Sequence, residues 1–479
     1  MTDSHRVLAS TDSSAYASLR QRPVTRRERF ELGKALRKDV PRRSLGEWSP
    51  PDSRPDPVDL ITASHAGRRE DLVRVRVARM MSSPYGFLRG SAVVMAWDVA
   101  HLPATGITPV VCGDAHLGNF GFYGSPEGEL VIDLNDFDEA HPGAWEWDLR
   151  RLTASIYVAG RENGVGEDDC AQAVRSCVHA YRDEVRFLAE EPLLRRSYNR
   201  LDVERLHESV TEASLRDEIA RAAKKARKKT SDRVLPRFTR ESADGRRIVT
   251  EPPLITPLPQ AEYEQVAVAL DGYLATLSPH WRRAVGGYTI VDIAHKVVGV
   301  GSVGLRAYVA LLEGSDPDDV LFLQLKEARR SVLAQYVHGD SVWHEHQGQR
   351  VVEYQQALQT VSDPLLGWTS VGRRQFYVRQ FRNMKGTIAL DAIDSAALTD
   401  YAGIVGHLLA KGHARTSGAS MIAGYVGKGD KLGQAMATFA RAYADQTEAD
   451  HAALVAAVRA GRLPVTEGTE LGGSAFRPS

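Results

Sequence analysis

Apolar side chains recur at helical spacing in two parts of the chain, separated by a stretch of different character. In the first part, "WEWDLRRLTASIYVAGRENG" and "DDCAQAVRSCVHAYRDEVRFLA" predict amphipathic helices, and Asn163-Gly164 predicts the end of the first one. In the second part, "LTDYAGIVGHLLAKGHA" predicts a helix that ends at Gly418. The last predicted helix, "LGQAMATFARAYADQTEADHAALVAAVRAG", ends at Gly461.

The stretch between these helices is rich in β-branched and aromatic residues. "YTIVDIAHKVVGVGSVGLRAYVALLEG", a "SDPDD" turn and "VLFLQLKEA" predict strands, and "QFYVRQF" predicts another after a helix around "GQRVVEYQQALQTV". Two short apolar runs in the first helical part, "TPVVCGD" and "GELVIDLND", predict strands as well. The pattern as a whole predicts an α+β fold.

These elements divide the chain into six segments. The first is a polar tail predicted to be disordered, and the second is an arm with a short helix and a Pro-rich connector. A helical part, a β-rich part, the C-terminal helices and a second tail follow. The six predicted segments are residues 1–25, 26–75, 76–280, 281–390, 391–460 and 461–479.

Composition excludes several classes of protein. The 479 residues include 61 basic and 61 acidic ones, so no net charge attracts the chain to nucleic acid or to a membrane. No run of about 18 apolar residues predicts a membrane span, and the N-terminus lacks the apolar core of a secretory signal. Three cysteines without metal-site spacing, Cys112, Cys170 and Cys177, argue against a disulfide framework. We expect a soluble, cytoplasmic protein.

One basic run, "AAKKARKKTSDRVLPRFTR" at residues 222–240, has two interpretations. A solvated helix and loop is the commoner outcome for a charge run of this length. The alternative is a patch that faces phosphate groups, since Lys and Arg pair readily with phosphoryl oxygens. Aromatic residues are nearly absent from the run, which argues against a platform for single-stranded nucleic acid.

Candidate chemistry concentrates at residues 110–141, where seven acidic side chains and two histidines accompany two short apolar runs. Isolated carboxylates at the ends of buried strands repel one another and resist desolvation. A divalent metal among them resolves this conflict most simply.

Within this stretch, "GDAHLGN" places Asp114, His116 and Asn119 on one tight loop, and "VIDLNDFDEAH" places Asp136 after the next predicted strand. Taken singly, these residues are ordinary turn residues or a packed histidine. Taken together, they offer a base, two oxygen ligands for a hard cation and an imidazole that faces phosphate. D-x-x-x-x-N followed by a strand and an Asp is the spacing of the catalytic and metal loops of protein kinases.

"GDAHLGN" closely resembles the "HGDxHxxN" loop of aminoglycoside and choline phosphotransferases, and "NDFDEAHPGAWEWDL" resembles their "IDFDDA…YDL" segment. These enzymes are the small-molecule branch of the protein-kinase-like superfamily. The resemblance implies that Asp114 is the catalytic base and that Asn119 and Asp136 bind magnesium. It places His116 where protein kinases carry a catalytic-loop lysine, and it makes Asp148 a buried residue that steadies the loop.

The chain departs from this pattern in two places. Cys112 stands where the family has the histidine before Gly-Asp, which leaves the anchoring of the loop open. Asp133 and Asp138 flank Asp136, so the assignment of the metal ligand within this cluster has three candidates.

A second motif, "VVGVGSVGLR", contains the G-x-G-x-x-G of Gly299, Gly301 and Gly304. A dinucleotide-binding fold needs a helix to begin at these glycines and an acid about 20 residues later. Strands follow instead, which favours the hairpin that covers nucleotide phosphates in kinases, with Ser302 as an added hydroxyl donor.

The strand after this hairpin carries Lys326 within an apolar run. A lysine that extends from a strand edge is the common alternative, but the position matches the phosphate-binding lysine of kinases. We expect Glu353 on the following helix to be its partner, with Glu345 as the second choice. Adjacent Glu327 points to the opposite face of the strand.

"VRQFRNMKG" would then contact the edge of the adenine, with no role assigned to Arg382 or Lys385.

The order of these motifs is the reverse of that in kinases, because Asp114 comes about 185 residues before Gly299. A circular permutation explains the order and is possible where chain termini lie close together at the surface. The resemblance thus implies a two-lobed protein-kinase-like fold, in which a small antiparallel β-rich lobe is bracketed by two halves of a larger helical lobe.

The whole chain also resembles the bacterial proteins grouped as domain-of-unknown-function family 2252. Matching blocks are "SPYGFLRG", "GDAHLGNFG", "NDFDEA…WEWDLRRL", "GVGSVG", "LQLKEA" and "VRQFRNMKG", between about residues 25 and 460. "SPYGFLRG" has no kinase counterpart, and its Phe87 and Arg89 serve either the substrate side or the structure.

From these resemblances we expect an ATP- and Mg²⁺-dependent phosphotransferase that acts on a small-molecule acceptor. Three alternatives are transfer of AMP on the same fold, a nucleotide-binding pseudokinase without catalysis, and a metal-dependent hydrolase that uses the acidic cluster alone. The acceptor and the oligomeric state leave no signal in the sequence.

Overall fold

The structure is a computed structural model that describes residues 7–8, 20, 24–243, 245–297, 303–338, 344–381, 383–391, 393–416 and 418–465. The fold is mixed α+β, as predicted, with 52% helix and 16% strand. Two of the predicted phosphate-loop glycines, Gly299 and Gly301, and also Ser302, lie outside the described residues.

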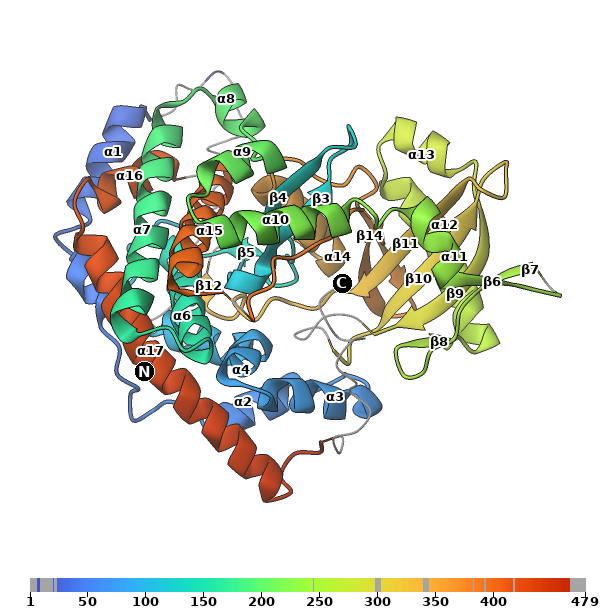
Figure 1. The fold of residues 1–479 in the computed structure, drawn as a ribbon, viewed down its shortest axis with the longest axis horizontal. Coiled ribbons are helices and arrows are strands. Elements are labelled where there is room, and N and C mark those ends of the chain that lie inside the picture. The colour runs from blue at the N-terminus through green and yellow to red at the C-terminus, as the bar shows by residue number, and fades with distance from the viewer. Residues whose placement is uncertain are drawn as a thin grey trace.

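A six-stranded antiparallel sheet lies at one end of the molecule (Figure 1), with the strand order β13-β14-β11-β10-β9-β8. Its strands are β8 (Ile255–Pro257), β9 (Thr289–Lys296), β10 (Ala307–Glu313), β11 (Val320–Glu327), β13 (Gly367–Val371) and β14 (Arg374–Gln380). The predicted strands around the glycine-rich stretch are therefore confirmed. In this register Lys326 on β11 lies between Ala307 and Tyr377 of the neighbouring strands.

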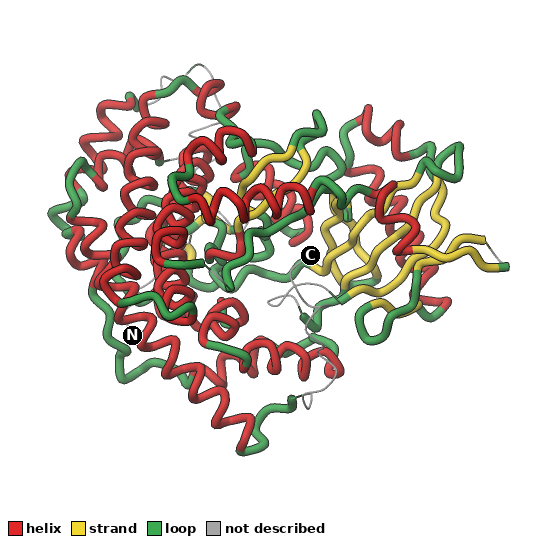
Figure 2. The backbone as a smooth tube through the Cα atoms, viewed as in Figure 1, coloured by secondary structure: helices red, strands yellow, loops and turns green. Residues whose placement is uncertain are grey.

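The helices gather at the other end of the molecule and around the sheet (Figure 2). Those before the sheet are α1 (Arg26–Ala35), α2 (Pro57–Ser64), α3 (Glu70–Met81), α4 (Pro84–Gly90), α5 (Ala92–Ala100), α6 (Trp145–Glu162), α7 (Glu167–Glu190), α8 (Leu193–Tyr198), α9 (Val203–Ser209), α10 (Ala213–Ala226) and α11 (Ser231–Phe238). Those within or after it are α12 (Gln260–Thr276), α13 (Pro279–Val285), α14 (Gln347–Leu358), α15 (Ser395–Thr416), α16 (Ala419–Val426) and α17 (Lys431–Arg459). As predicted, α6 ends just before Asn163-Gly164, where Gly164 has a φ of 71°.

The helices of the two halves of the chain form one core. Buried apolar residues of α6 and α7 share a single cluster with those of α15, α16 and α17. Gly406 on α15 lies so close to α7 that a β-carbon there would come within 2.1 Å of the carbonyl oxygen of Cys177. Because only glycine permits this approach, the C-terminal helices are built into the same unit as the helices before the sheet.

The sheet has a smaller apolar core of its own. Val266, Leu270 and Tyr273 of α12 pack with residues of β9, β10, β11 and β14. The sheet and its covering helix thus draw on residues from Ile255 onward, which lie before the expected start of the β-rich part at residue 281. The strand β8 was not predicted from the sequence because it is only three residues long.

Four two-stranded sheets make up the rest of the β-structure in the described residues. They are β1 (Val7–Leu8) with β12 (Val337–His338), β2 (Val110–Val111) with β5 (His141–Pro142), β3 (Phe120–Gly124) with β4 (Leu130–Leu134), and β6 (Thr239–Ser242) with β7 (Gly245–Ile248). The second and third pairs bring the stretch after β2 and the stretch after β4 next to each other.

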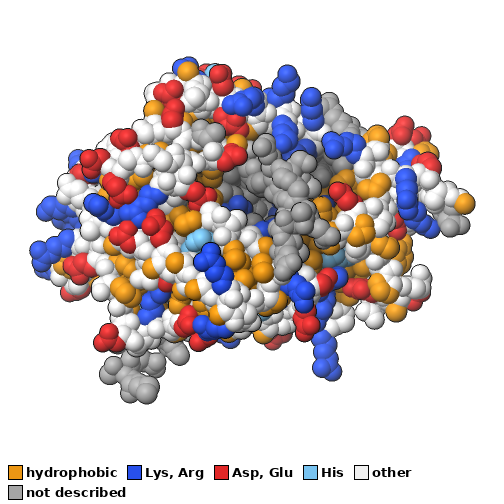
Figure 3. All heavy atoms as spheres, turned by 60° about the horizontal axis from the view of Figure 1, so that its bottom comes forward, with side chains coloured by type: hydrophobic (Ala, Val, Ile, Leu, Met, Phe, Trp, Pro, Cys, Tyr) orange, Lys and Arg blue, Asp and Glu red, His pale blue; other side chains and the backbone are white. Residues whose placement is uncertain are grey.

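On the face that Figure 3 shows, acidic and basic side chains are interspersed, as the balanced composition leads one to expect. Among the described residues, no helix has the length and apolar character required to cross a membrane.

Candidate active site

Two segments far apart in sequence meet at Lys326. Its Nζ donates a hydrogen bond of 3.0 Å to Oδ2 of Asp138 and lies 3.5 Å from Oδ1 of Asp136, although 188 residues separate Lys326 from Asp138. The hydroxyl of Tyr377 on β14 donates to the other carboxylate oxygen of Asp138 at 2.8 Å. The sheet and the acidic stretch therefore face each other at one point.

Lys326 and Asp138 stabilise each other's charged form. Burial opposes ionisation of Asp138, but Lys326 and the hydrogen bonds from Lys326 and Tyr377 outweigh burial and lower the pKa of Asp138 to about 2. Burial also disfavours the charged form of Lys326, but Asp136 and Asp138 raise its pKa above the ordinary value. Both groups are charged at neutral pH.

The prediction that Glu353 pairs with Lys326 is wrong. Glu353 lies 2.6 Å from Nε2 of His344 and accepts from the side chain of Gln349 at 2.8 Å. The side of α14 that faces the acidic stretch carries Arg350 instead, which donates to the carbonyl oxygen of Asp138 at 2.8 Å.

The other two glutamates considered for Lys326 do not pair with it either. Glu345, the second choice, is exposed, and its backbone carbonyl accepts from the side chain of Gln375. Glu327 lies on the opposite face of β11, as expected, where it pairs with Arg306 and Arg374.

The loop that carries Asp114 is anchored from behind by Asp148 of α6. The carboxylate of Asp148 accepts from the backbone N–H groups of Cys112 at 2.6 Å and of Gly113 at 2.8 Å, and Nε2 of His413 on α15 lies 3.2 Å away. Gly113 has a φ of 77°, and a β-carbon there would lie 2.3 Å from the carbonyl oxygen of Glu139. Glycine at this position lets the two loops touch.

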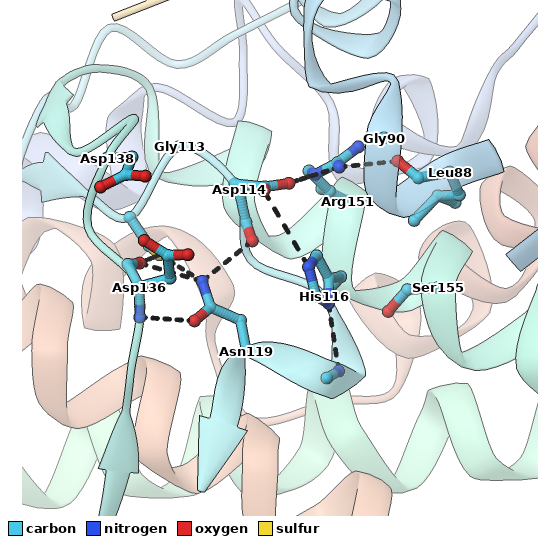
Figure 4. Close-up of polar contacts among 12 residues, drawn as sticks. Leu88, Gly90, Gly113, Asp114, His116, Asn119, Asp136, Asp138, Arg151 and Ser155 are labelled. Atoms are coloured by element: carbon cyan, nitrogen blue, oxygen red, sulfur yellow. Dashed lines mark hydrogen bonds and ion pairs between the residues drawn. The ribbon is translucent and has the colours of Figure 1, made fainter. Parts of the chain in front are cut away.

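Asn119 joins the loop of Asp114 to the loop of Asp136 (Figure 4). Its side-chain NH₂ donates to the carbonyl oxygens of Asp114 at 3.2 Å and of Asp136 at 3.0 Å, and its Oδ1 accepts from the N–H of Asp136 at 2.7 Å. Cys112 also contributes to the contact between the two loops, because its sulfur contacts both the side chain of Asn119 and the carbonyl oxygen of Asp136.

The carboxylate of Asp136 keeps capacity for a ligand. Its Oδ1 is buried and accepts no hydrogen bond among the described residues, while the side chain as a whole is 47% exposed. Asp133, by contrast, is buried and accepts from the N–H groups of Leu134 and Thr360. Of the three candidates in this cluster, Asp136 is the one with a buried carboxylate oxygen that accepts no hydrogen bond, and Nζ of Lys326 lies 3.5 Å from that oxygen.

Asp114 is held between Arg151 and His116, as Figure 4 shows. Nε of Arg151 donates to Oδ1 of Asp114 at 2.6 Å, and Arg151 also donates to the carbonyl oxygen of Leu88 at 2.9 Å. Burial raises the pKa of Asp114 to about 7, although Arg151 acts in the opposite direction. A carboxylate with a pKa near neutral is suited to proton transfer.

His116 is neutral in this environment. Burial and the nearby charges of Arg89 and Arg151 lower its pKa well below the ordinary value. Its Nδ1 accepts from the N–H of Gly118 at 3.1 Å, so the proton belongs on Nε2, which lies 3.9 Å from Oδ2 of Asp114. His116 is therefore a neutral donor on the side of Asp114 Oδ2.

The sequence did not lead to a prediction for Arg151 or Arg350. For Arg151, a hint was present: it lies one turn after Asp148 in the largely apolar helix "WEWDLRRL". Asp148 and Arg151 are both buried in the structure. A buried arginine needs acceptors, and Arg151 has the carboxylate of Asp114 as one of them.

The sequence as a whole matches one family model, over residues 68–457, with the description "Uncharacterized protein conserved in bacteria (DUF2252)". The chain belongs to this family. No curated protein and no solved structure matches the sequence of this chain.

The sheet side of this site carries two further basic residues beside Lys326. Lys385 follows β14, and burial together with Arg379 and Lys326 lowers its pKa well below the ordinary value. Lys385 and Arg379 line a small cavity of about 20 Å³ together with Asn135 and Asp363. An anion bound beside Lys385 would favour its charged form.

The residues also fit a magnesium ion bound together with phosphates. Within the described chain, no group of three or more His, Cys, Asp or Glu side chains is arranged to hold a metal. Mg²⁺ is usually held by one or two carboxylates plus substrate phosphates and water rather than by a cage of protein ligands. The unused oxygen of Asp136 and the second lone pair of Asn119 Oδ1 are the donors available for it.

Proposed function

We propose that this DUF2252 protein is an ATP- and Mg²⁺-dependent phosphotransferase that acts on a small-molecule acceptor. The observation that carries the proposal is the meeting of Lys326 with Asp136 and Asp138, with Asp114 on the adjoining loop. A polyphosphate at this point contacts a lysine from the sheet and the oxygen ligands of the acidic stretch at once. Phosphoryl transfer requires mainly such positioning and charge stabilisation.

The chain's own residues divide the work as follows. Lys326, with Arg379 and Lys385 nearby, binds the phosphates, and Asp136 and Asn119 would hold Mg²⁺, which supplies charge neutralisation when bound. Asp114 orients the acceptor hydroxyl and accepts its proton at Oδ2, the oxygen not bonded to Arg151. Arg151 and Asp148 fix the position of that carboxylate without contacting substrate.

We further propose that the fold is a circularly permuted, two-lobed kinase-like fold. The support is the position of α15, whose residue Thr416 accepts from the N–H of Val110 on β2 at 3.1 Å. A C-terminal helix thus ends beside the strand that leads into the loop of Asp114, which is the neighbourhood expected if the chain break has been moved.

Nucleotide binding tests the proposal directly. We expect ATP to raise the melting temperature of the full chain, and to raise it more with Mg²⁺ than without. Ligand at about 100 times its Kd adds about 2.7 kcal/mol to the free energy of unfolding. Absence of any shift with ATP and Mg²⁺ contradicts the proposal, and mass spectrometry of reaction products separates a phosphoryl adduct from a nucleotidyl one.

The raised pKa of Asp114 predicts the pH dependence of the reaction. Only the ionised carboxylate accepts a proton, so kcat/KM should rise with pH up to about 7 and then level off. The profile of kcat/KM reports the pKa values of groups in the free enzyme. The measurement is ADP release across the pH range; a profile that is flat through pH 7 would remove Asp114 as the base.

A further inference from the structure

A cavity of about 460 Å³ lies directly beside the loop of Asp114. Gly118 forms part of its wall, and the N–H of Gly118 donates to the hydroxyl of Tyr85, another lining residue, at 2.9 Å. His116 connects this wall to the site, since it contacts Gly118 on one side and lies 3.9 Å from Asp114 Oδ2 on the other. His116 thus lies between the cavity wall and the oxygen of Asp114 that is not bonded to Arg151.

The cavity wall includes a cation without a counter-ion. Arg89 of α4 forms no hydrogen bond or ion pair with the described residues, and its Nε is buried. Its guanidinium lies 6.0 Å from the centre of the Tyr85 ring. A guanidinium that is partly desolvated and unpaired carries a cost that an anionic ligand would remove.

The other charges of the wall leave a small positive excess. Lys225 of α10 contributes an ammonium group, and Lys229, just after α10, also lines the wall. Arg221 pairs with Glu218 at 2.9 Å. The remaining acids are Glu162, which accepts from the N–H of Tyr85 at 3.0 Å, and Asp391, which is exposed. Four basic side chains thus face three acidic ones.

The rest of the wall is apolar, with Ala159, Ala222, Ile388 and Leu390. A cavity of this volume is in the range that holds a small organic molecule, and a few charged groups on an apolar wall fix its orientation. Three unrelated segments meet here: "SPYGFLRG", the basic run that ends α10, and the chain after β14.

We propose that this cavity binds the acceptor and selects one that carries an anionic group, a phosphate or a carboxylate, held by Arg89, Lys225 and Lys229. The inference rests on the proposed phosphotransferase function. It gives "SPYGFLRG" a substrate-binding role and gives the basic run a phosphate- or carboxylate-facing one. Positively charged acceptors are disfavoured by the same three cations.

Calorimetric titration of the full chain tests this with five probes: inorganic phosphate, glucose 6-phosphate, gluconate, glucose and glucosamine. We expect an anionic probe to bind more tightly than glucose or glucosamine. Arg89→Gln and Lys225→Gln should each weaken that binding about tenfold, the loss expected for one charge-assisted hydrogen bond. Arg74→Gln, at an exposed site on α3, is the matched control and should change nothing.

The same samples are titrated with ATP and Mg²⁺, so that the two proposals fail separately. If ATP binds while no anionic probe binds, or while neutral and cationic probes bind equally well, the acceptor inference is overturned and the phosphotransferase stands. Anion binding that is unchanged in both Arg89→Gln and Lys225→Gln overturns it too. If Arg89-dependent anion binding persists without any binding of ATP, the anion site stands and the phosphotransferase falls. Lys225 is exposed, so Lys225→Gln should fold and its affinity for the anionic probe can be measured even if Arg89→Gln fails to fold.

Discussion

Asp114→Asn should lower turnover by about 10²- to 10⁴-fold and leave the binding of ATP and Mg²⁺ intact. The substitution keeps the size of the side chain and removes the group that accepts the proton. It does not touch Lys326 or the carboxylate of Asp136, which hold the nucleotide in the proposed site. ADP release and the ATP-induced shift in melting temperature measure the two effects separately.

Two opposing effects act on the fold. Burial raises the pKa of Asp114 to about 7, so a neutral amide removes the cost of the buried carboxylate. The substitution also takes the counter-ion from the buried Arg151, although the asparagine oxygen can still accept from it. The melting temperature of the variant without nucleotide measures the balance. The matched control is Asp71→Asn, an exposed aspartate paired with Arg69 on α3, which should retain full turnover. Turnover at the wild-type rate in Asp114→Asn would exclude Asp114 as the base.

The relation between pH and stability provides an independent check of the same residue. Because the folded-state pKa lies above the ordinary value, the protonated form of Asp114 stabilises the fold at low pH, and this contribution is lost as the pH rises through about 7. Asp114→Asn lacks this term. The stability of the variant relative to wild type should therefore increase by up to about 1.4 kcal/mol per pH unit between about pH 4 and 7.

Much of the site was predictable from local sequence. Helix ends are determined by nearby residues, and α6 ends at Glu162 as the following Asn163-Gly164 predicted. The loops of Asp114 and Asp136 were also recognisable, since each follows a strand and the strands between them are consecutive. Consecutive strands pair in most folds, which brings their ends together without further information.

The partner of Lys326 was not predictable in the same way. Its contacts with Asp136 and Asp138 join β11 to a stretch that lies 188 residues earlier and outside the sheet, so they depend on how the sheet packs against the rest of the molecule. Glu353 and Arg350 lie three residues apart on α14, so a small rotation of the helix decides which one faces the site. Sequence periodicity places α14 but does not fix that rotation.

The cavity beside Gly118 shows a different limit. It is built from α4, α6, α10 and the chain after β14, which are distant in sequence. From the sequence, a solvated face was the favoured interpretation of residues 222–240, and only the position of α10 across the middle of the molecule brings Lys225 to the same cavity as Arg89 (Figure 1). Tertiary packing, rather than composition, places part of the run on the wall of a cavity.

Lys326→Met should abolish the stabilisation by ATP and Mg²⁺ and, with it, turnover. The lysine is the residue of the sheet that forms ion pairs with both Asp136 and Asp138, and its side chain is only 5% exposed. Its removal also leaves Asp138 buried without its counter-ion, and breaking a buried pair in this way costs about 3–5 kcal/mol of folding stability. Thermal melts with and without nucleotide measure both losses.

A second substitution separates the loss of nucleotide from the loss of stability. Lys326→Met combined with Asp138→Asn removes both charges of the pair, so the melting temperature should recover toward that of the wild type while ATP still fails to bind. Lys38→Met, at an exposed site after α1, is the matched control. A metal-dependent hydrolase that used Asp114 and Asp136 but neither Lys326 nor Asp138 would keep its activity in the double variant. Activity there at the wild-type level would overturn the phosphotransferase, because Lys326 is the side chain proposed to bind the phosphates.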